Sequence, residues 1–390
     1  MRVFLAVVLA SLLARLGYQM ARSPVLPRFA EELGASPELL GVIVAASTVT
    51  GVFFKLPSGA LSDIFGKKRV MVIGGLFFAI PPFLYPMIGD ATALLALRFL
   101  HGFATAIFSP VAAAYIAGLA VDRRGTRLGW VASANDAGAL AGPMIGGFVL
   151  FLTASFDATF LSVGALGVVT LAVILLLPAD RPAGDRPAES GRWSGFWQGL
   201  KEVVSTPAIL FASGAEAAMY LGFGAFLGFL PVYASAAALD DGEITLVLGA
   251  QLLTALIVKP AAGWLSDRVG RKPVILAGLL AAAASLPLIF RAEGFAALVM
   301  FAPLLGLGVG AVTPVTNALV ADLVKDRQLG AAMGTFGTIW DIGESAGPIL
   351  AGFLIAQMSY GASFDIVAGV MLVAAAILAL GVREPRRAPA

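Results

Sequence analysis

One segment occurs twice in the chain, and this repeat constrains the fold more than any other feature. Residues 59–74 read GALSDIFGKKRVMVIG, and residues 263–278 read GWLSDRVGRKPVILAG. Eight identical residues recur at a constant spacing of 204 positions, which is about half of the 390-residue chain. Long apolar runs flank both copies. We therefore expect two halves that descend from one ancestral unit.

The composition indicates that these apolar runs lie in a membrane. Hydrophobic residues make up 59% of the chain and charged residues 13%, with a mean hydropathy of +0.91, whereas roughly a quarter of a soluble domain is charged. A span needs about 20 largely apolar residues and must be helical, because lipid offers the backbone no hydrogen-bond partner. We predict twelve such helices, near residues 3–24, 38–61, 69–89, 91–119, 126–152, 158–178, 206–233, 243–265, 273–290, 296–321, 329–357 and 363–382. The expected fold class is an all-α polytopic membrane protein with two pseudo-symmetric six-helix bundles.

Lysine and arginine residues predict the orientation in the membrane. With both termini on the inner side, the inner loops hold 19 of the 26 basic residues, and the outer loops hold Arg28 and Arg291. This asymmetry follows the positive-inside rule and predicts a multi-pass protein of the inner or plasma membrane with cytoplasmic termini. The first apolar run lacks a good signal-peptide cleavage site, so we interpret it as the first span.

A segment rich in proline, glycine and charged residues separates the sixth span from the seventh. We predict an N-terminal six-helix bundle over residues 1–178, a cytoplasmic linker over 179–205 and a C-terminal six-helix bundle over 206–390. Near the end of the linker, apolar side chains recur at helical spacing, which predicts an amphipathic helix in the inner interface. These side chains are Trp193, Phe196, Trp197, Leu200 and Val204.

Glycines and a proline recur at matching positions in the fifth and eleventh spans. Glycines four residues apart line one helix face and let a neighbouring backbone approach closely, and the proline permits a bend. The predicted helix-packing residues are Gly138, Gly142, Pro143 and Gly146 in the fifth span and Gly343, Gly347 and Pro348 in the eleventh. The tetrapeptide ASFD also occurs in both halves, at 154–157 and 362–365. These matches extend the repeat well beyond the loop.

Three motifs carry a family resemblance. The repeated loop is similar to the pattern G-x-L-a-D-r-x-G-r-k, and the segment from Arg98 to Gly102 is similar to R-x-x-q-G, with His101 where glutamine is usual. The glycine-proline pattern from Gly129 to Gly147 looks like the fifth-span motif of drug/proton antiporters. Over essentially its whole length, the chain therefore resembles the major facilitator superfamily, and in particular its exporter branch. The resemblance implies two six-helix bundles around a midplane cavity that opens alternately to each side.

The resemblance also implies that the repeated loop is a latch between the two halves. Asp63 would accept charge-assisted hydrogen bonds from basic groups and from a helix N-terminus in the outward-facing state. The alternative is that the basic residues of the loop only enforce the topology. The residues concerned are Gly59, Asp63, Gly66, Lys67 and Lys68 in the first copy and Gly263, Asp267, Gly270 and Arg271 in the second.

Titratable side chains inside the spans are candidates for proton coupling. They are Asp136, Asp341, Glu344, Glu216 and His101. A charge in a span costs roughly 2.5–3.5 kcal/mol on insertion scales, so it faces a cavity or a partner. Glu344 shares a helix face with Asp341; the two carboxylates cannot both ionise easily, and one can carry a proton. The alternative is a permanent ion pair with a buried base such as Arg15 or Lys259, and for His101 a packing role stays open.

Basic, polar and aromatic side chains inside the spans are candidates for the substrate cavity. They are Arg15, Tyr18, Gln19, Lys55, Arg98, Phe223, Lys259 and Trp340. The two lysines could instead snorkel toward the inner interface, and the aromatic residues could simply pack or face lipid. The chain has no acid before Glu31, whereas exporters of the resembled branch often carry one in the first span. The excess of bases within the spans favours an anionic or zwitterionic substrate.

Together these features predict a proton-coupled antiporter that exports a small drug-like, anionic or amphiphilic molecule by rocker-switch alternating access. The alternatives are a metabolite symporter for uptake and a lipid or amphiphile exporter. A membrane enzyme or sensor is disfavoured, because the sequence contains no HExxH, GxSxG or P-loop pattern. With no cysteine and one histidine, we expect no metal and no cofactor, the proton gradient being the energy source. The expected partners are the substrate, protons and the bilayer, without nucleic acid, and the expected state is a monomer.

Overall fold

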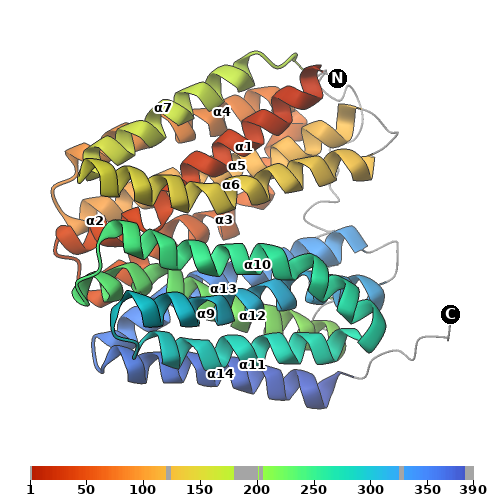
Figure 1. Ribbon diagram of the computed structural model, residues 1–390. Coiled ribbons are helices and arrows are strands. Elements are labelled where there is room, and N and C mark those ends of the chain that lie inside the picture. Colours follow the sequence, from red (N-terminus) through yellow and green to blue (C-terminus); the bar gives the residue numbers. More distant parts are fainter. Residues whose placement is uncertain (1, 120–123, 180–200, 202–204, 325–328, 383–390) are drawn as a thin grey trace. The chain divides into compact units, whose positions relative to one another are not determined.

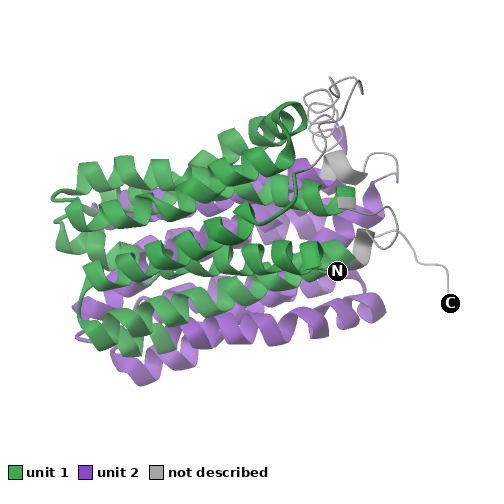
Figure 2. Ribbon diagram, turned by 90° about the horizontal axis from the view of Figure 1, so that it is seen from above, with its two compact units in different colours: residues 1–192, 239–246 green, residues 193–238, 247–390 purple. Residues whose placement is uncertain are grey.

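The computed structural model describes residues 2–119, 124–179, 201, 205–324 and 329–382. Within these ranges the chain forms helices and no strand (Figure 1). Two compact units are present (Figure 2): unit 1 comprises Met1–Arg192 with Leu239–Leu246, and unit 2 comprises Trp193–Ala238 with Val247–Ala390. The predicted amphipathic helix of the linker lies outside the described residues.

The helices of unit 1 come in chain order from the N-terminal half. They are α1 (Arg2–Arg22), α2 (Val25–Glu32), α3 (Pro37–Phe65), α4 (Lys67–Ala79), the 3₁₀ helix η1 (Pro81–Met87), α5 (Ala91–Leu119), α6 (Arg124–Thr153) and α7 (Phe156–Leu175). The remaining helices are α9 (Pro207–Ala236), α10 (Asp241–Val269), α11 (Arg271–Ile289), α12 (Gly294–Leu323), α13 (Leu329–Ile355) and α14 (Tyr360–Gly381). The first residues of α10, up to Leu246, group with unit 1, and the rest of α10 belongs to unit 2.

Among the described residues, eleven helical segments are long and apolar enough to cross a membrane. They correspond to the predicted spans apart from 329–357, which coincides with α13. Two spans are less regular than predicted. The helix expected over 69–89 changes at Pro81 to a 3₁₀ helix, because Pro81, Pro82 and Pro86 lack the amide hydrogen that an α-helix needs. The first span extends to Glu32 and is interrupted at Pro24, which lies between α1 and α2.

Serine caps show where the repeat holds in register and where it does not. Ser155 caps α7 by accepting a hydrogen bond of 3.1 Å from Ala158 N, and Ser359 caps α14 by accepting one of 3.3 Å from Ala362 N. The two caps are 204 positions apart, like the repeated loop. The two ASFD segments are not equivalent, because Ser363 lies one turn inside α14. The interpretation of ASFD as a matched pair was therefore wrong by one helical turn.

The glycines set the distances between helices within each unit. In unit 1, Gly102 of α5 faces α3, and a Cβ atom there would lie 2.8 Å from Ser47 O and 2.7 Å from the Cβ of Thr50. In unit 2, a Cβ atom at Gly306 of α12 would overlap the backbone of α10 at Gln251. The predicted packing glycines act in the same way: Gly138, Gly142 and Gly146 bring α6 against α1, and Gly343 and Gly347 bring α13 against α9. Close approach of helices through glycine is the typical membrane packing mode.

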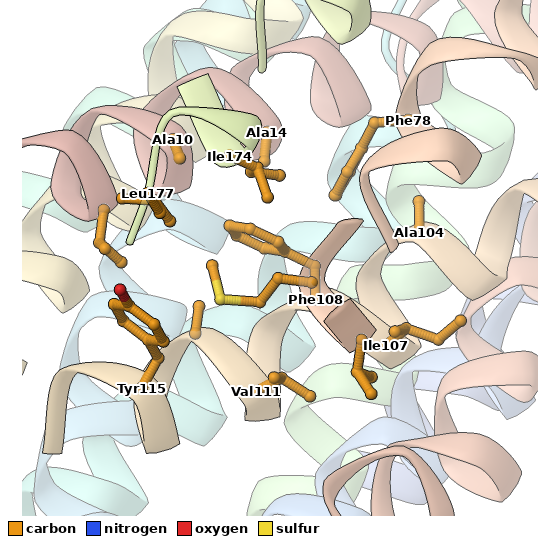
Figure 3. Close-up of a cluster of buried hydrophobic side chains, with 14 of the residues drawn as sticks. Ala10, Ala14, Phe78, Ala104, Ile107, Phe108, Val111, Tyr115, Ile174 and Leu177 are labelled. Atoms are coloured by element: carbon orange, nitrogen blue, oxygen red, sulfur yellow. The ribbon is translucent and has the colours of Figure 1, made fainter. Parts of the chain in front are cut away.

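An apolar cluster fills unit 1 beside these crossings. Side chains from α1, α4 and α5 meet the end of α7 there, with Ala14, Phe78, Phe108 and Leu177 among them (Figure 3). The rings of Phe78 and Phe108 are nearly perpendicular, with centroids 5.7 Å apart. The hydroxyl of Tyr115 donates a hydrogen bond of 2.9 Å to Pro178 O at the edge of the cluster. This packing surrounds the polar residues described next.

Candidate functional site

Unit 2 contains a completely buried carboxyl group inside a membrane helix. Glu216 of α9 has an exposed fraction of 0%. Its Oε2 lies 2.5 Å from Oγ1 of Thr316 on α12, and its Oε1 has no hydrogen-bond partner. Lys259 of α10 is near enough to act on the carboxyl electrostatically. The sequence gave Glu216 no priority over the other acids, and its burial does.

The hydroxyl of Thr316 distinguishes the two charge states of Glu216. A hydroxyl has one proton to donate, and Oγ1 of Thr316 lies 2.9 Å from Val312 O as well as 2.5 Å from Glu216 Oε2. A protonated Glu216 can donate to Thr316 while Thr316 donates to Val312, so both protons have acceptors. An ionised Glu216 takes the Thr316 proton and leaves Oε1 as a charged, buried acceptor without a donor. The arrangement therefore suits the protonated acid.

An aromatic group formed by Tyr220, Phe223 and Trp340 lies next to Glu216 along α9. Tyr220 follows Glu216 by four residues and so lies on the same helix face. Its ring centroid is 4.5 Å from that of Trp340 on α13 and 5.9 Å from that of Phe223, to which it is perpendicular. Phe223 and Trp340 are partly exposed, and the buried Nε1 of Trp340 has no hydrogen-bond partner. An aromatic ligand could therefore stack here and offer an acceptor to the indole.

Unit 1 contains a second buried polar group, the Arg98 cluster, formed by Tyr18, Ser47, Tyr85, Arg98 and His101. Arg98 of α5 is fully buried and donates from Nη2 to Ser47 Oγ at 2.7 Å and from Nη1 to the Tyr85 hydroxyl at 3.3 Å. The Tyr85 oxygen lies 3.0 Å from His101 Nδ1. The guanidinium carbon is 5.9 Å from the centre of the Tyr18 ring. Arg98 and His101, one turn apart in sequence, are thus joined through Tyr85.

The structure brings some of the other candidates into these groups and leaves others at the edge. Gln19 and Glu344 are buried, with exposed fractions of 8% and 9%. Asp136 is exposed within unit 1. The partly exposed candidates are Arg15, Lys55, Lys259 and Asp341. Among the described residues, no group of three or more His, Cys, Asp or Glu side chains could hold a metal ion.

The two copies of the loop motif share a backbone and differ in their ion pairs. Gly66 and Gly270 both have positive φ, at 91° and 101°, which favours glycine at this turn. In the first copy, Lys67 Nζ lies 3.8 Å from Asp63 Oδ1. In the second, Arg271 bridges Asp267 at 2.7 Å and Asp322, near the end of α12, at 3.2 Å. The second copy therefore ties the loop to another helix of its own unit.

Comparison with known proteins identifies the family. The sequence profile described as Major Facilitator Superfamily matches residues 7–240 and 212–390. The chain belongs to the major facilitator superfamily. It is similar to an uncharacterized MFS-type transporter of Methanocaldococcus jannaschii, with 24% identity over 370 residues that cover 90% of this chain and 92% of the relative. It is 25% identical over 343 residues to the quinolone resistance protein NorA of Staphylococcus aureus, covering 85% and 84% of the two chains.

Solved structures support the same fold. A crystal structure of a mutant of the nucleoside transporter NupG superimposes with a TM-score of 0.78 at 16% identity and covers 98% of this chain and 100% of that one. Identity at this level supports the superfamily fold alone. Family and fold together indicate a membrane transporter rather than an enzyme.

For this superfamily member, sequence reasoning missed Ser47, Tyr85 and Thr316. Each carries a neutral hydroxyl, and such residues are too common in membrane helices to be distinguished by sequence. Tyr85 gave a weak signal, since it is one of six tyrosines and lies between two prolines of the interrupted third span.

Proposed function

We propose that this transporter is a proton-coupled antiporter that exports a small aromatic molecule with an anionic group. In this proposal it lies in the cell membrane with both termini in the cytoplasm, and its two six-helix halves, joined by the 179–205 linker, work by rocker-switch alternating access. The repeated loop, through Asp63 and Asp267, stabilises one end state. Export is favoured over uptake by the exporter-type motif in α6 and by the likeness to a quinolone resistance protein.

The burial of Glu216 is the observation that carries the proposal. A carboxyl with no exposure and one unpartnered oxygen is costly to ionise where it lies. It can release its proton only when a change of state brings water or a cation to it. Proton release at one side and uptake at the other is the property that a coupling residue needs. Asp341, Glu344 and Asp136 are the secondary candidates for this role.

The proposed substrate follows from the two polar groups. The aromatic group in unit 2 offers a ring to stack on and an indole N–H without a partner. The Arg98 cluster supplies a permanent positive charge, because a guanidinium does not lose its proton in proteins. A zwitterionic quinolone combines an aromatic ring, a carbonyl and a carboxylate, and it is therefore a suitable probe.

Transport into proteoliposomes tests the proposal. The purified protein is reconstituted, the membrane potential is clamped at zero, and uptake of the fluorescent quinolone norfloxacin is followed with the lumen acidic, neutral or alkaline. An antiporter accumulates the probe only when the lumen is acidic, because protons leave as the probe enters. Accumulation with an alkaline lumen would instead support the alternative of symport and uptake. Equal flux in all three conditions would refute proton coupling.

A further inference from the structure

Arg98 is a buried cation that neutral hydroxyls hold in place. Its two terminal nitrogens donate to Ser47 and Tyr85, and Nε has no partner. Among the described residues, no carboxylate bonds to the guanidinium. A charge buried in this way needs a fixed orientation, because any loss of a hydrogen bond leaves a charged donor unsatisfied. The residues that orient Tyr85 therefore matter for Arg98.

The hydrogen-bond directions around Tyr85 assign the state of His101. A guanidinium can only donate, so the Tyr85 oxygen accepts from Arg98 at 3.3 Å. The single phenolic proton of Tyr85 must then go elsewhere, and His101 Nδ1 lies 3.0 Å away. Nδ1 is thus the acceptor and carries no proton. The imidazole is neutral, with its proton on Nε2.

The surroundings of Nε2 agree with this tautomer. The atom is buried and has no hydrogen-bond acceptor in the described residues. The ring of Tyr18 lies with its centroid 5.4 Å from that of His101 at an interplanar angle of 71°, an edge-to-face arrangement. An N–H group can point weakly at an aromatic face. A second proton, on Nδ1, would remove the acceptor of Tyr85 and place a cation next to Arg98.

We propose that His101 is a positioning residue: as a neutral acceptor it orients the Tyr85 hydroxyl, which fixes Arg98 to receive the anionic group of the substrate. This role differs from the proton coupling that the sequence suggested for His101. The position of Arg98 follows from the hydrogen bonds alone, while the use of Arg98 by substrate rests on the proposed function. The two parts are tested separately.

Nitrogen NMR tests the positioning part without any transport measurement. His101 is the only histidine of the chain, so protein labelled with ¹⁵N-histidine gives one pair of ring signals. At pH 7 we expect a hydrogen-bonded, unprotonated Nδ1 and a protonated Nε2, and Tyr85→Phe should shift the Nδ1 signal toward that of a free acceptor. A proton on Nδ1, an imidazolium, or a spectrum that Tyr85→Phe leaves unchanged would overturn the assignment.

Two variants of equal size test the functional part. Asparagine places an acceptor oxygen near the position of Nδ1, and leucine has the same number of side-chain heavy atoms without an acceptor. In norfloxacin transport, His101→Leu and Tyr85→Phe should each raise KM about tenfold, the range for a hydrogen bond to a charged group, with less effect on the maximum rate. His101→Asn should stay within about threefold of the wild type. Equal KM values for His101→Leu and His101→Asn would refute the role.

The outcomes separate this inference from the proposed function. If the wild type moves no norfloxacin in any gradient, the proposed function fails, while the NMR result still decides the state of His101. If His101→Leu does not fold, Tyr85→Phe supplies the same comparison with almost no change in volume.

Discussion

Replacing Glu216 by glutamine should remove the driving force for export while leaving the fold and the binding cavity intact. Glutamine has the shape of a protonated carboxyl, and its amide can keep the contact with Oγ1 of Thr316, which is 2.5 Å long in the wild type. It cannot take up or release a proton. The variant should therefore bind substrate and change state, but it should not couple these steps to protons.

The structure sets the size of the effect. Among the acidic side chains of the described residues, Glu216 alone has an exposed fraction of 0%, so we expect one proton per cycle. One proton moving down a difference of one pH unit supplies about 1.4 kcal/mol, which sustains about a tenfold substrate gradient. With the membrane potential clamped, the wild type should accumulate norfloxacin about tenfold per pH unit. Glu216→Gln should reach the same concentration inside and outside.

The assay needs a test of folding and a matched control. Exchange of labelled for unlabelled probe requires no proton, so Glu216→Gln should retain it. Glu293→Gln makes the same chemical change at an exposed residue of unit 2 and should behave as wild type. Concentrative uptake by Glu216→Gln would refute the coupling role of this residue. Loss of both uptake and exchange, in a protein that remains folded by thermal unfolding, would refute the reasoning that glutamine mimics the protonated state.

Further predictions concern neighbouring features. Thr316→Val removes the hydroxyl that bonds to Glu216 at similar volume; norfloxacin uptake in the same vesicles should fall several-fold and lie between wild type and Glu216→Gln. Gly347→Ala adds a Cβ that overlaps Leu221 O, so thermal unfolding should show a loss of about 1–3 kcal/mol, whereas Gly334→Ala on the same helix meets open space and should cost nothing. Asp63→Asn breaks only a pair of 3.8 Å at the surface and should change the melting temperature little, so a slower turnover in stopped-flow transport would reflect the latch.

The fold could be predicted well because membrane spans depend on a few strong constraints. The predicted helix over 91–119 coincides with α5, and the other spans agree to within a few residues apart from the two irregular ones. Length and apolar composition determine such helices, and tertiary packing changes them little. The errors arose where single residues override the average, as Pro81 does in the third span. ASFD was misleading because a short match cannot fix register to one turn.

The candidate sites could be predicted only in part. Arg98, His101 and Glu216 were found because a titratable side chain in a span is rare and costly. Their partners Tyr85 and Thr316 were not, because a hydroxyl in a span costs little and carries no signal. The rotation of each helix about its axis decides which of these groups meet. Composition and spacing do not determine that rotation.

The repeat preserves the backbone contacts, while the chemistry lies at positions where the halves differ. Gly102 and Gly306, 204 positions apart, both admit a neighbouring helix, and the cap serines Ser155 and Ser359 follow the same spacing. Arg98 and His101, by contrast, correspond to the buried apolar residues Ala302 and Leu305. A duplicated bundle can keep its packing in both halves because packing depends on small residues at fixed positions. A buried cation and a buried acid are each needed once, since a second copy would double the cost of burying charge without adding a function. Disagreement between positions 204 apart is therefore a better guide to functional residues in this chain than agreement.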